Sequence, residues 1–176
     1  MDRAQSEHLA RVRHLRETFV EANERLVTRL RRASDEAAGR EGDGVWSAAQ
    51  IGWHVAMVTT RFAGLISGDV AGPQPLGEAF RERPWAEIAP TIPDRAKAPT
   101  AVLPPPGVRR TDAVAALEAA GMKMARAFDT LTPDRGGRMG ITHAMVGTIN
   151  VYQIGEWATA HIMRHNRQAK RALGEP

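Results

Sequence analysis

Two histidines near the end of the chain, His161 and His165, have a spacing that can bind a metal ion. They are four residues apart in the stretch WATAHIMRHNRQ, residues 157–168. Residues four apart on a helix lie on the same face about one turn apart, so both imidazoles can converge on one ion. No glutamate follows the first histidine, as it does in the HExxH zinc enzymes. A base for metal-assisted chemistry must therefore come from elsewhere in the chain.

A third histidine, His54, is predicted to enter the same core. His54 lies on the apolar face of a predicted helix, which consists of Ile51, His54, Val58, Phe62 and Leu65. The C-terminal pair lies on another such face, with alternating steps of four and three: Ile154, Ala158, His161, His165, Gln168 and Ala172. Three imidazoles leave at least one coordination position of an ion open, which is the catalytic rather than the structural form of a metal site.

Ordinary core packing is the alternative interpretation of these histidines. A core-facing histidine is commonly a hydrogen-bonded packing residue, and HxxxH pairs arise by chance in many helices. Three inward-facing imidazoles without evident partners are nevertheless costly unless something satisfies their nitrogens. We expect His8 and His14 to be exposed among the charges of the first helix, and His143 to lie in a loop. We therefore predict that the three inward-facing histidines are metal ligands.

The composition restricts the chemistry further. The chain has no cysteine, which excludes disulfides, thiolate metal ligands and a cysteine nucleophile. A metal must be held by nitrogen or oxygen, and three histidines suit zinc first, with nickel or iron as alternatives. The 24 lysines and arginines exceed the 20 acidic residues, but the two signs are interleaved as on a solvated helix face. We expect no nucleic-acid partner.

Periodicity and caps predict the elements that position the histidines. Apolar residues recur at threes and fours in four long segments, which predicts helices over about 5–37, 47 to 67 or 68, 111 or 112 to about 130, and 148 or 150 to 173. Ser47 followed by Gln50 forms a capping box, and Gly174 is placed to end the last helix. Residues 69–110 are rich in proline and glycine and form a long crossover. We find no convincing strand.

These elements make an all-α protein, a four-helix bundle with a long Pro-rich crossover between the second and third helices. The length of 176 residues fits a single domain, 1–176. The N-terminus is charged from its second residue, and no stretch of 18 apolar residues lacks a charge or polar break. We therefore expect a cytoplasmic protein with no membrane partner.

Two stretches resemble a known family. VWSAAQIGWHVAMV (45–58) is similar to the DinB-like segment in which a Trp-Ser start leads to a helix with one histidine. GTINVYQIGEWATAHIMRHNRQAKR (147–171) resembles the final helix of that family, with HxxxH followed by a glutamine. The resemblance is to the DinB/YfiT-like four-helix metalloproteins and covers most of the chain. It implies a divalent metal held by His54, His161 and His165, and frequent homodimers.

The resemblance also suggests what a reaction could be. Members with assigned activities include S-transferases and a maleylpyruvate isomerase that use low-molecular-weight thiols such as mycothiol, bacillithiol or glutathione. We expect a small-molecule substrate and a thiol-dependent transferase, an isomerase or a hydrolase, with a non-catalytic stress-response bundle as the alternative. Gln168 is a candidate for orienting the ring of His165. Trp53 and Trp157 are candidates for lining a pocket beside the histidines. Glu156 points away from the inward face, and the catalytic acid and base stay unknown.

Overall fold

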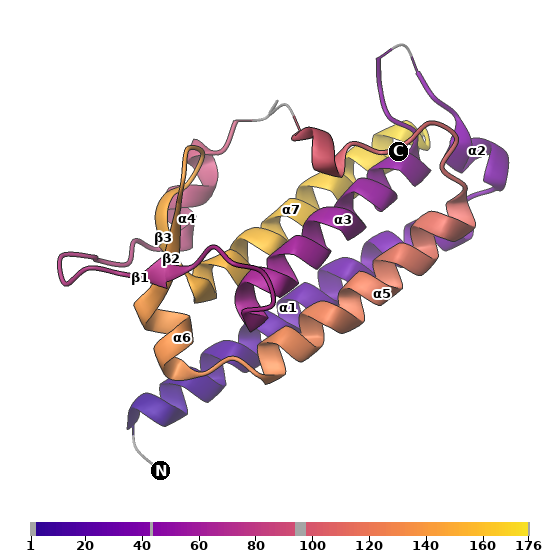
Figure 1. Ribbon diagram of the computed structural model, residues 1–176. Coiled ribbons are helices and arrows are strands. Elements are labelled where there is room, and N and C mark those ends of the chain that lie inside the picture. The colour runs from indigo at the N-terminus through magenta and orange to yellow at the C-terminus, as the bar shows by residue number, and fades with distance from the viewer. Residues whose placement is uncertain (1–2, 43, 94–97, 176) are drawn as a thin grey trace.

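The computed structural model describes residues 3–42, 44–93 and 98–175 (Figure 1). Four long helices dominate the described residues: α1 (Arg3–Arg32), α3 (Ala48–Ser67), α5 (Arg110–Asp129) and α7 (Val151–Ala172). They pack side by side in the ring order α1, α5, α3, α7. The prediction of an all-α four-helix bundle is confirmed.

The ring order explains how distant histidines meet. Helix α3 packs against α5 on one side and α7 on the other, whereas it makes few contacts with α1. His54 on α3 and the HxxxH pair on α7 therefore occupy neighbouring helices. Close packing at Gly52 supports this arrangement, because a Cβ there would lie 2.6 Å from a side-chain carbon of Leu30. The absence of a side chain lets α3 sit deep in the bundle.

The first helix is shorter than the periodicity predicts. We expected a helix over about 5–37, but α1 ends at Arg32, and a separate short helix, α2, spans Asp35–Gly39. The reason is local: the Ser34 hydroxyl accepts a hydrogen bond from the Ala37 backbone at 3.1 Å and caps a new helix. The start of α5 at Arg110 is one residue earlier than expected, and neither Thr111 nor Asp112 acts as its N-cap.

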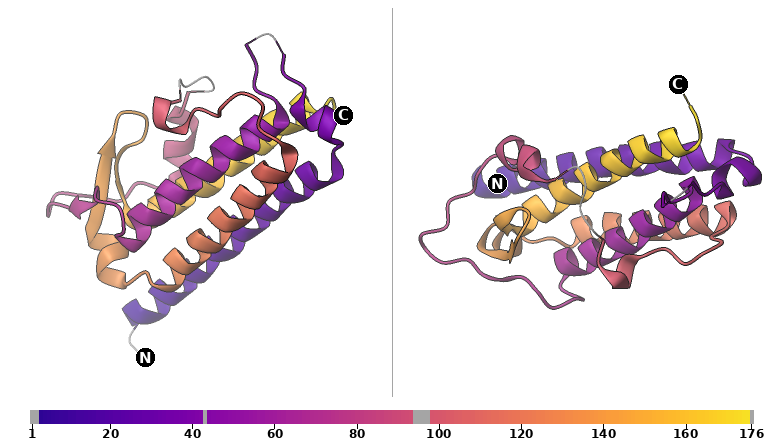
Figure 2. Two further views of the ribbon diagram at one scale, coloured as in Figure 1. Left: turned by 45° about the vertical axis from the view of Figure 1, so that its right-hand side comes forward. Right: turned by 90° about the horizontal axis from the view of Figure 1, so that it is seen from above.

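The prediction that the chain has no strand is wrong. A small antiparallel sheet of order β1-β2-β3 forms from β1 (Gln74–Pro75), β2 (Met139–His143) and β3 (Gly147–Asn150). Its strands are too short to produce a clear alternating pattern, and β1 lies in the crossover, far from β2 in sequence. Figure 2 shows the sheet at one end of the bundle, with α2 and the C-terminal end of α7 at the other.

The crossover between α3 and α5 is mostly irregular, as its prolines predict. Its short regular pieces, besides β1, are α4 (Trp85–Ile88), η1 (Ala89–Thr91) and η2 (Thr100–Val102), and α6 (Pro133–Arg138) connects α5 to the sheet. The crossover packs on the bundle through Ile88 and Val102, which are buried. No helix in the described part of the chain is long and apolar enough to cross a membrane.

Candidate metal centre

Local hydrogen bonds fix the start of helix α3 and so the place of His54. The Ser47 hydroxyl accepts from the Gln50 backbone at 3.2 Å, and the Gln50 side chain accepts from the Ser47 backbone at 2.9 Å. This is the capping box that the sequence predicts. His54 follows Ser47 by about two turns and is only 4% exposed.

A second capping box starts α7. The Asn150 side chain accepts from the Gln153 backbone at 3.0 Å, and the Gln153 side chain accepts from the Asn150 backbone at 3.2 Å. Of the two expected starts, Thr148 and Asn150, the second is therefore confirmed. His161 follows Asn150 by about three turns and lies on the face that packs against α3, and His165 follows one turn later. His165 is 8% exposed, and His161 is partly exposed.

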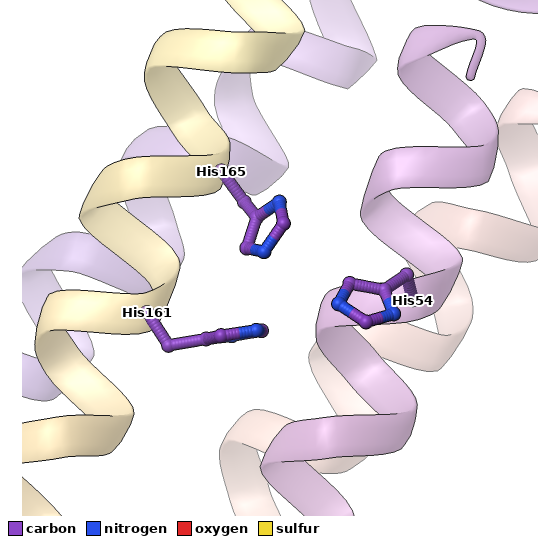
Figure 3. Close-up of side chains that lie close together, drawn as sticks. All are labelled: His54, His161 and His165. Atoms are coloured by element: carbon purple, nitrogen blue, oxygen red, sulfur yellow. The ribbon is translucent and has the colours of Figure 1, made fainter. Parts of the chain in front are cut away.

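The structure brings His54, His161 and His165 together. Their ring centroids are 4.3 Å apart for His161 and His165, 4.8 Å for His54 and His165, and 5.3 Å for His54 and His161. Figure 3 shows the three rings in the space between α3 and α7, each with a nitrogen directed toward the others. One ligand atom from each residue lies within 4.8 Å of the other two.

The His54 ring is oriented by the crossover. Its Nδ1 lies 2.8 Å from the backbone oxygen of Val102. A carbonyl oxygen can only accept, so Nδ1 carries the hydrogen and Nε2 keeps its lone pair. This arrangement is typical of a metal-binding histidine, whose second nitrogen is held by a carbonyl or carboxylate. His54 is therefore set to present Nε2 as a ligand.

The α7 histidines differ, because their Nδ1 atoms lack partners. Nδ1 of His161 and Nδ1 of His165 are both buried without a hydrogen bond among the described residues. Gln168, one turn beyond His165, interacts with that ring without forming a hydrogen bond of good geometry to Nδ1. A buried imidazole that leaves polar atoms unpaired is costly. This cost argues against ordinary core packing as the role of the pair.

All three imidazoles are held in the neutral form that binds metals. Burial, together with the neighbouring His54, lowers the pKa of His165 to about 3. Burial also lowers the pKa of His161 well below its usual range, with contributions from His165 and His54. The pKa of His54 is lowered by burial, against the effect of its bond to Val102. A metal at neutral pH has no proton to displace from these rings.

The ligand atoms can reach a single ion after a movement of the rings. A tetrahedral ion with metal–nitrogen bonds of about 2.0–2.1 Å places its nitrogens about 3.4 Å apart. The ligand atoms of the three histidines lie within 4.8 Å of one another, so the widest pair must close by up to about 1.4 Å. Rotation of the α7 rings, whose Nδ1 atoms are not fixed, can close that gap. The donor set and its burial therefore fit a divalent cation.

Comparison with known proteins agrees with the site. Residues 18–169 match the family model of the DinB superfamily, a range that includes all three histidines. The chain belongs to the DinB superfamily. Searches of the curated proteins and of the solved structures found no match. The resemblance seen in the sequence is thus confirmed at the level of the DinB family.

Aromatic side chains surround the histidines of this DinB protein. Trp46 lies beside His54, with ring centroids 4.9 Å apart. Phe62 lies 6.3 Å from His161 and 5.1 Å from Trp157. Trp157 was expected as a wall residue and is buried next to the centre. Trp46 was not singled out as a wall, although its place just before the Ser47 cap directs it toward the first turns of α3.

The other histidines lie away from the cluster. His14 is exposed as expected, but the expectation for His8 is wrong. His8 is 8% exposed, and its Nδ1 lies 2.6 Å from the hydroxyl of Tyr152. His143 lies at the end of β2 rather than in a loop, and its ring packs on Trp157 at 5.0 Å. None of these three joins the metal-ligand group found among the described residues.

Glu156 faces away from the metal centre, in agreement with its predicted position on α7. Its carboxylate pairs with Arg11 of α1 at 3.4 Å. Arg11 also pairs with Glu82, which accepts a hydrogen bond from Asn150 at 2.7 Å. Burial raises the pKa of the Glu156 carboxyl. This cluster ties the crossover to α1 and α7 and supplies no base to the histidines.

Proposed function

We propose that this DinB protein is a metal-dependent enzyme that holds a divalent ion through His54, His161 and His165 and acts on a small molecule. The observation that carries the proposal is the convergence of three neutral imidazoles, two of them with unpaired Nδ1 atoms. Zinc is the expected ion, with nickel or iron as alternatives. The reaction class that we propose is thiol-dependent transfer or isomerisation, or hydrolysis.

Three histidines leave part of the coordination sphere for a reactant. When bound, a divalent ion lowers the pKa of water or of a thiol, so that a nucleophile forms at neutral pH. The contribution of this chain is to hold three uncharged donors in place. The Val102 carbonyl, which holds His54, is also uncharged. The donor set therefore leaves the positive charge of the ion available to an anionic ligand such as a thiolate.

The surroundings of the histidines favour an organic substrate. Trp46 and Phe62 provide apolar ring surface beside the imidazoles, and Trp157 packs behind Phe62. Such surface restricts water and binds apolar parts of ligands. Because the chain contains no cysteine, a thiol must arrive as a co-substrate. The resemblance to thiol-dependent family members supports mycothiol, bacillithiol or glutathione as that class of molecule.

Turnover assays on metal-loaded protein test the proposal. Zinc-loaded protein is mixed with each thiol and a chlorodinitrobenzene electrophile, and separately with a nitrophenyl ester. We expect turnover in one assay, its loss in the His161→Ala variant, and its retention in His14→Ala, which changes an exposed histidine on α1. A protein that holds a stoichiometric ion but turns over neither class of substrate is a non-catalytic metal-binding bundle, and the enzymatic proposal is then wrong.

The dimer is proposed on the resemblance, and the location and the absence of a nucleic-acid partner on the charge and hydropathy patterns of the sequence. We propose a cytoplasmic homodimer with no nucleic-acid partner. Sedimentation equilibrium of the purified protein tests the dimer, and a monomer at every concentration contradicts it.

A further inference from the structure

Two glutamines link the histidine-bearing helices to the crossover. Gln50 in α3 and Gln153 in α7 occupy the same position of their capping boxes, three residues after the cap. In each case Oε1 accepts from the cap backbone, while Nε2 donates to a crossover carbonyl. Gln50 Nε2 lies 3.3 Å from the Pro105 oxygen, and Gln153 Nε2 lies 2.7 Å from the Arg83 oxygen. The two helices therefore hold the crossover at two separate points.

Gln50 is the more connected of the two. Its Nε2 also donates to the Glu41 carboxylate at 2.8 Å, so one carboxamide joins the segment before α3, the first turn of α3 and the crossover. The side chain is buried, with 6% of the residue exposed. A buried amide with its donor and acceptor groups all engaged fixes the geometry of its partners.

The crossover segment held by Gln50 is the one that orients His54. Pro105 follows Val102 by three residues, and the Val102 oxygen accepts the His54 Nδ1 hydrogen at 2.8 Å. The backbone N–H of Leu103 donates to the Thr100 oxygen at 3.2 Å, which closes the turn η2 that ends at Val102. Only two residues separate Val102 from Pro105, so displacement at Pro105 is transmitted over a short segment. Gln50 and His54 are also one turn apart on the same helix.

We propose that Gln50 is a positioning residue of the metal centre. By holding Pro105, it keeps the Val102 carbonyl against His54 and so fixes the tautomer and the ring orientation of that ligand. His161 and His165 have no such support among the described residues, so the site depends on His54 as its oriented ligand. The inference rests on the proposed metal binding. Loss of such a supporting contact lowers metal affinity by about 10–100-fold.

A matched pair of variants tests this role. In Gln50→Glu, the new carboxylate still accepts from the Ser47 backbone, because glutamate serves equally in a capping box, but it cannot donate to Pro105. Gln153→Glu makes the same change in the other capping box and releases the crossover at Arg83 instead. Zinc affinity is measured by competition with a chromophoric chelator. We expect zinc binding about 10–100-fold weaker in Gln50→Glu and close to native in Gln153→Glu.

A spectroscopic measurement separates positioning from a general loss of structure. In native protein, nitrogen-15 NMR should show His54 with its hydrogen on Nδ1, and Gln50→Glu should show a mixture of tautomers. Unfolding by urea measures the stability of both variants. Equal zinc affinity in the two variants, or an unchanged His54 tautomer in Gln50→Glu, overturns the proposal.

Charge repulsion is the competing explanation, because Gln50→Glu places a second carboxylate beside Glu41. The double variant Glu41→Gln with Gln50→Glu removes this repulsion and leaves Pro105 without its donor. Persistent weak zinc binding supports the proposal, and recovery of native affinity contradicts it. Native protein that binds no zinc disproves the proposed function itself, which is a separate result from equal affinities in the two glutamate variants.

Discussion

Acidification of the metal-free protein should lower its free energy of unfolding, because the folded state keeps its buried histidines neutral. The perturbation is a change from pH 7 to pH 5 in the presence of a chelator. Burial lowers the pKa of His165 to about 3 and that of His161 well below its usual range. The folded protein therefore keeps both rings neutral at pH 5, whereas the unfolded chain protonates them. Stability is present above about pH 6.5 and falls as the pH decreases from there toward about 3.

The size of this effect follows from the folded and unfolded pKa values of His165. At pH 5, an imidazole with an unfolded pKa of 6.5 that stays neutral in the folded state favours unfolding by about 2 kcal/mol. His161 and His54, whose pKa values are also lowered by burial, add to this in the same direction. An effect of about 2 kcal/mol or more is a substantial part of the roughly 5–15 kcal/mol stability typical of a folded protein.

Urea unfolding, followed by circular dichroism at several pH values, measures this difference. Other titrating groups also contribute, so native protein is compared with a double variant, His161→Leu with His165→Leu. The double variant should lose at least about 2 kcal/mol less than native protein between pH 7 and pH 5. The His14→Gln control changes an exposed residue and should follow native protein. An identical pH dependence in native protein and the double variant refutes the assignment of buried, neutral imidazoles.

Three further predictions concern the scaffold, each measured by the free energy of unfolding. Tyr152→Phe removes the hydroxyl 2.6 Å from Nδ1 of buried His8 and should cost about 1–3 kcal/mol; no change means that the contact is not formed. Phe19→Ala empties a fully buried position and should cost about 3–5 kcal/mol, and a loss below about 1 kcal/mol contradicts the packing described. Asn150→Ala removes the cap that accepts from Gln153 and should cost about 1 kcal/mol, whereas Asn150→Ser, which keeps a capping oxygen and adds no charge beside Glu82, should lose less.

Local chemistry made the three-histidine cluster predictable. The capping box of Ser47 and Gln50 sets the start of α3, and helical periodicity then places His54 on the inward face. The same periodicity places His161 and His165 together on α7. Both arguments use neighbours within one or two turns, where spacing and direction are fixed by the helix itself.

Features that depend on distant partners were not predictable. His8 is buried because it meets Tyr152, a residue at the other end of the chain, and the charges around it suggested exposure. Val102 holds His54 through its backbone carbonyl. Every residue has a backbone carbonyl, so the sequence does not indicate which one makes this contact. The short sheet was also not predicted, because β1 and β2 are far apart in the sequence and pair only in the folded chain.

Metal content tests the central claim most directly. Protein is loaded with zinc, dialysed and analysed for metal by mass spectrometry. Native protein should retain about one ion per chain, and His54→Ala, His161→Ala and His165→Ala should each retain far less. His143→Ala, which changes the exposed ring packed on Trp157, should match native protein. If His161→Ala retains as much zinc as native protein, the three histidines do not form the metal site.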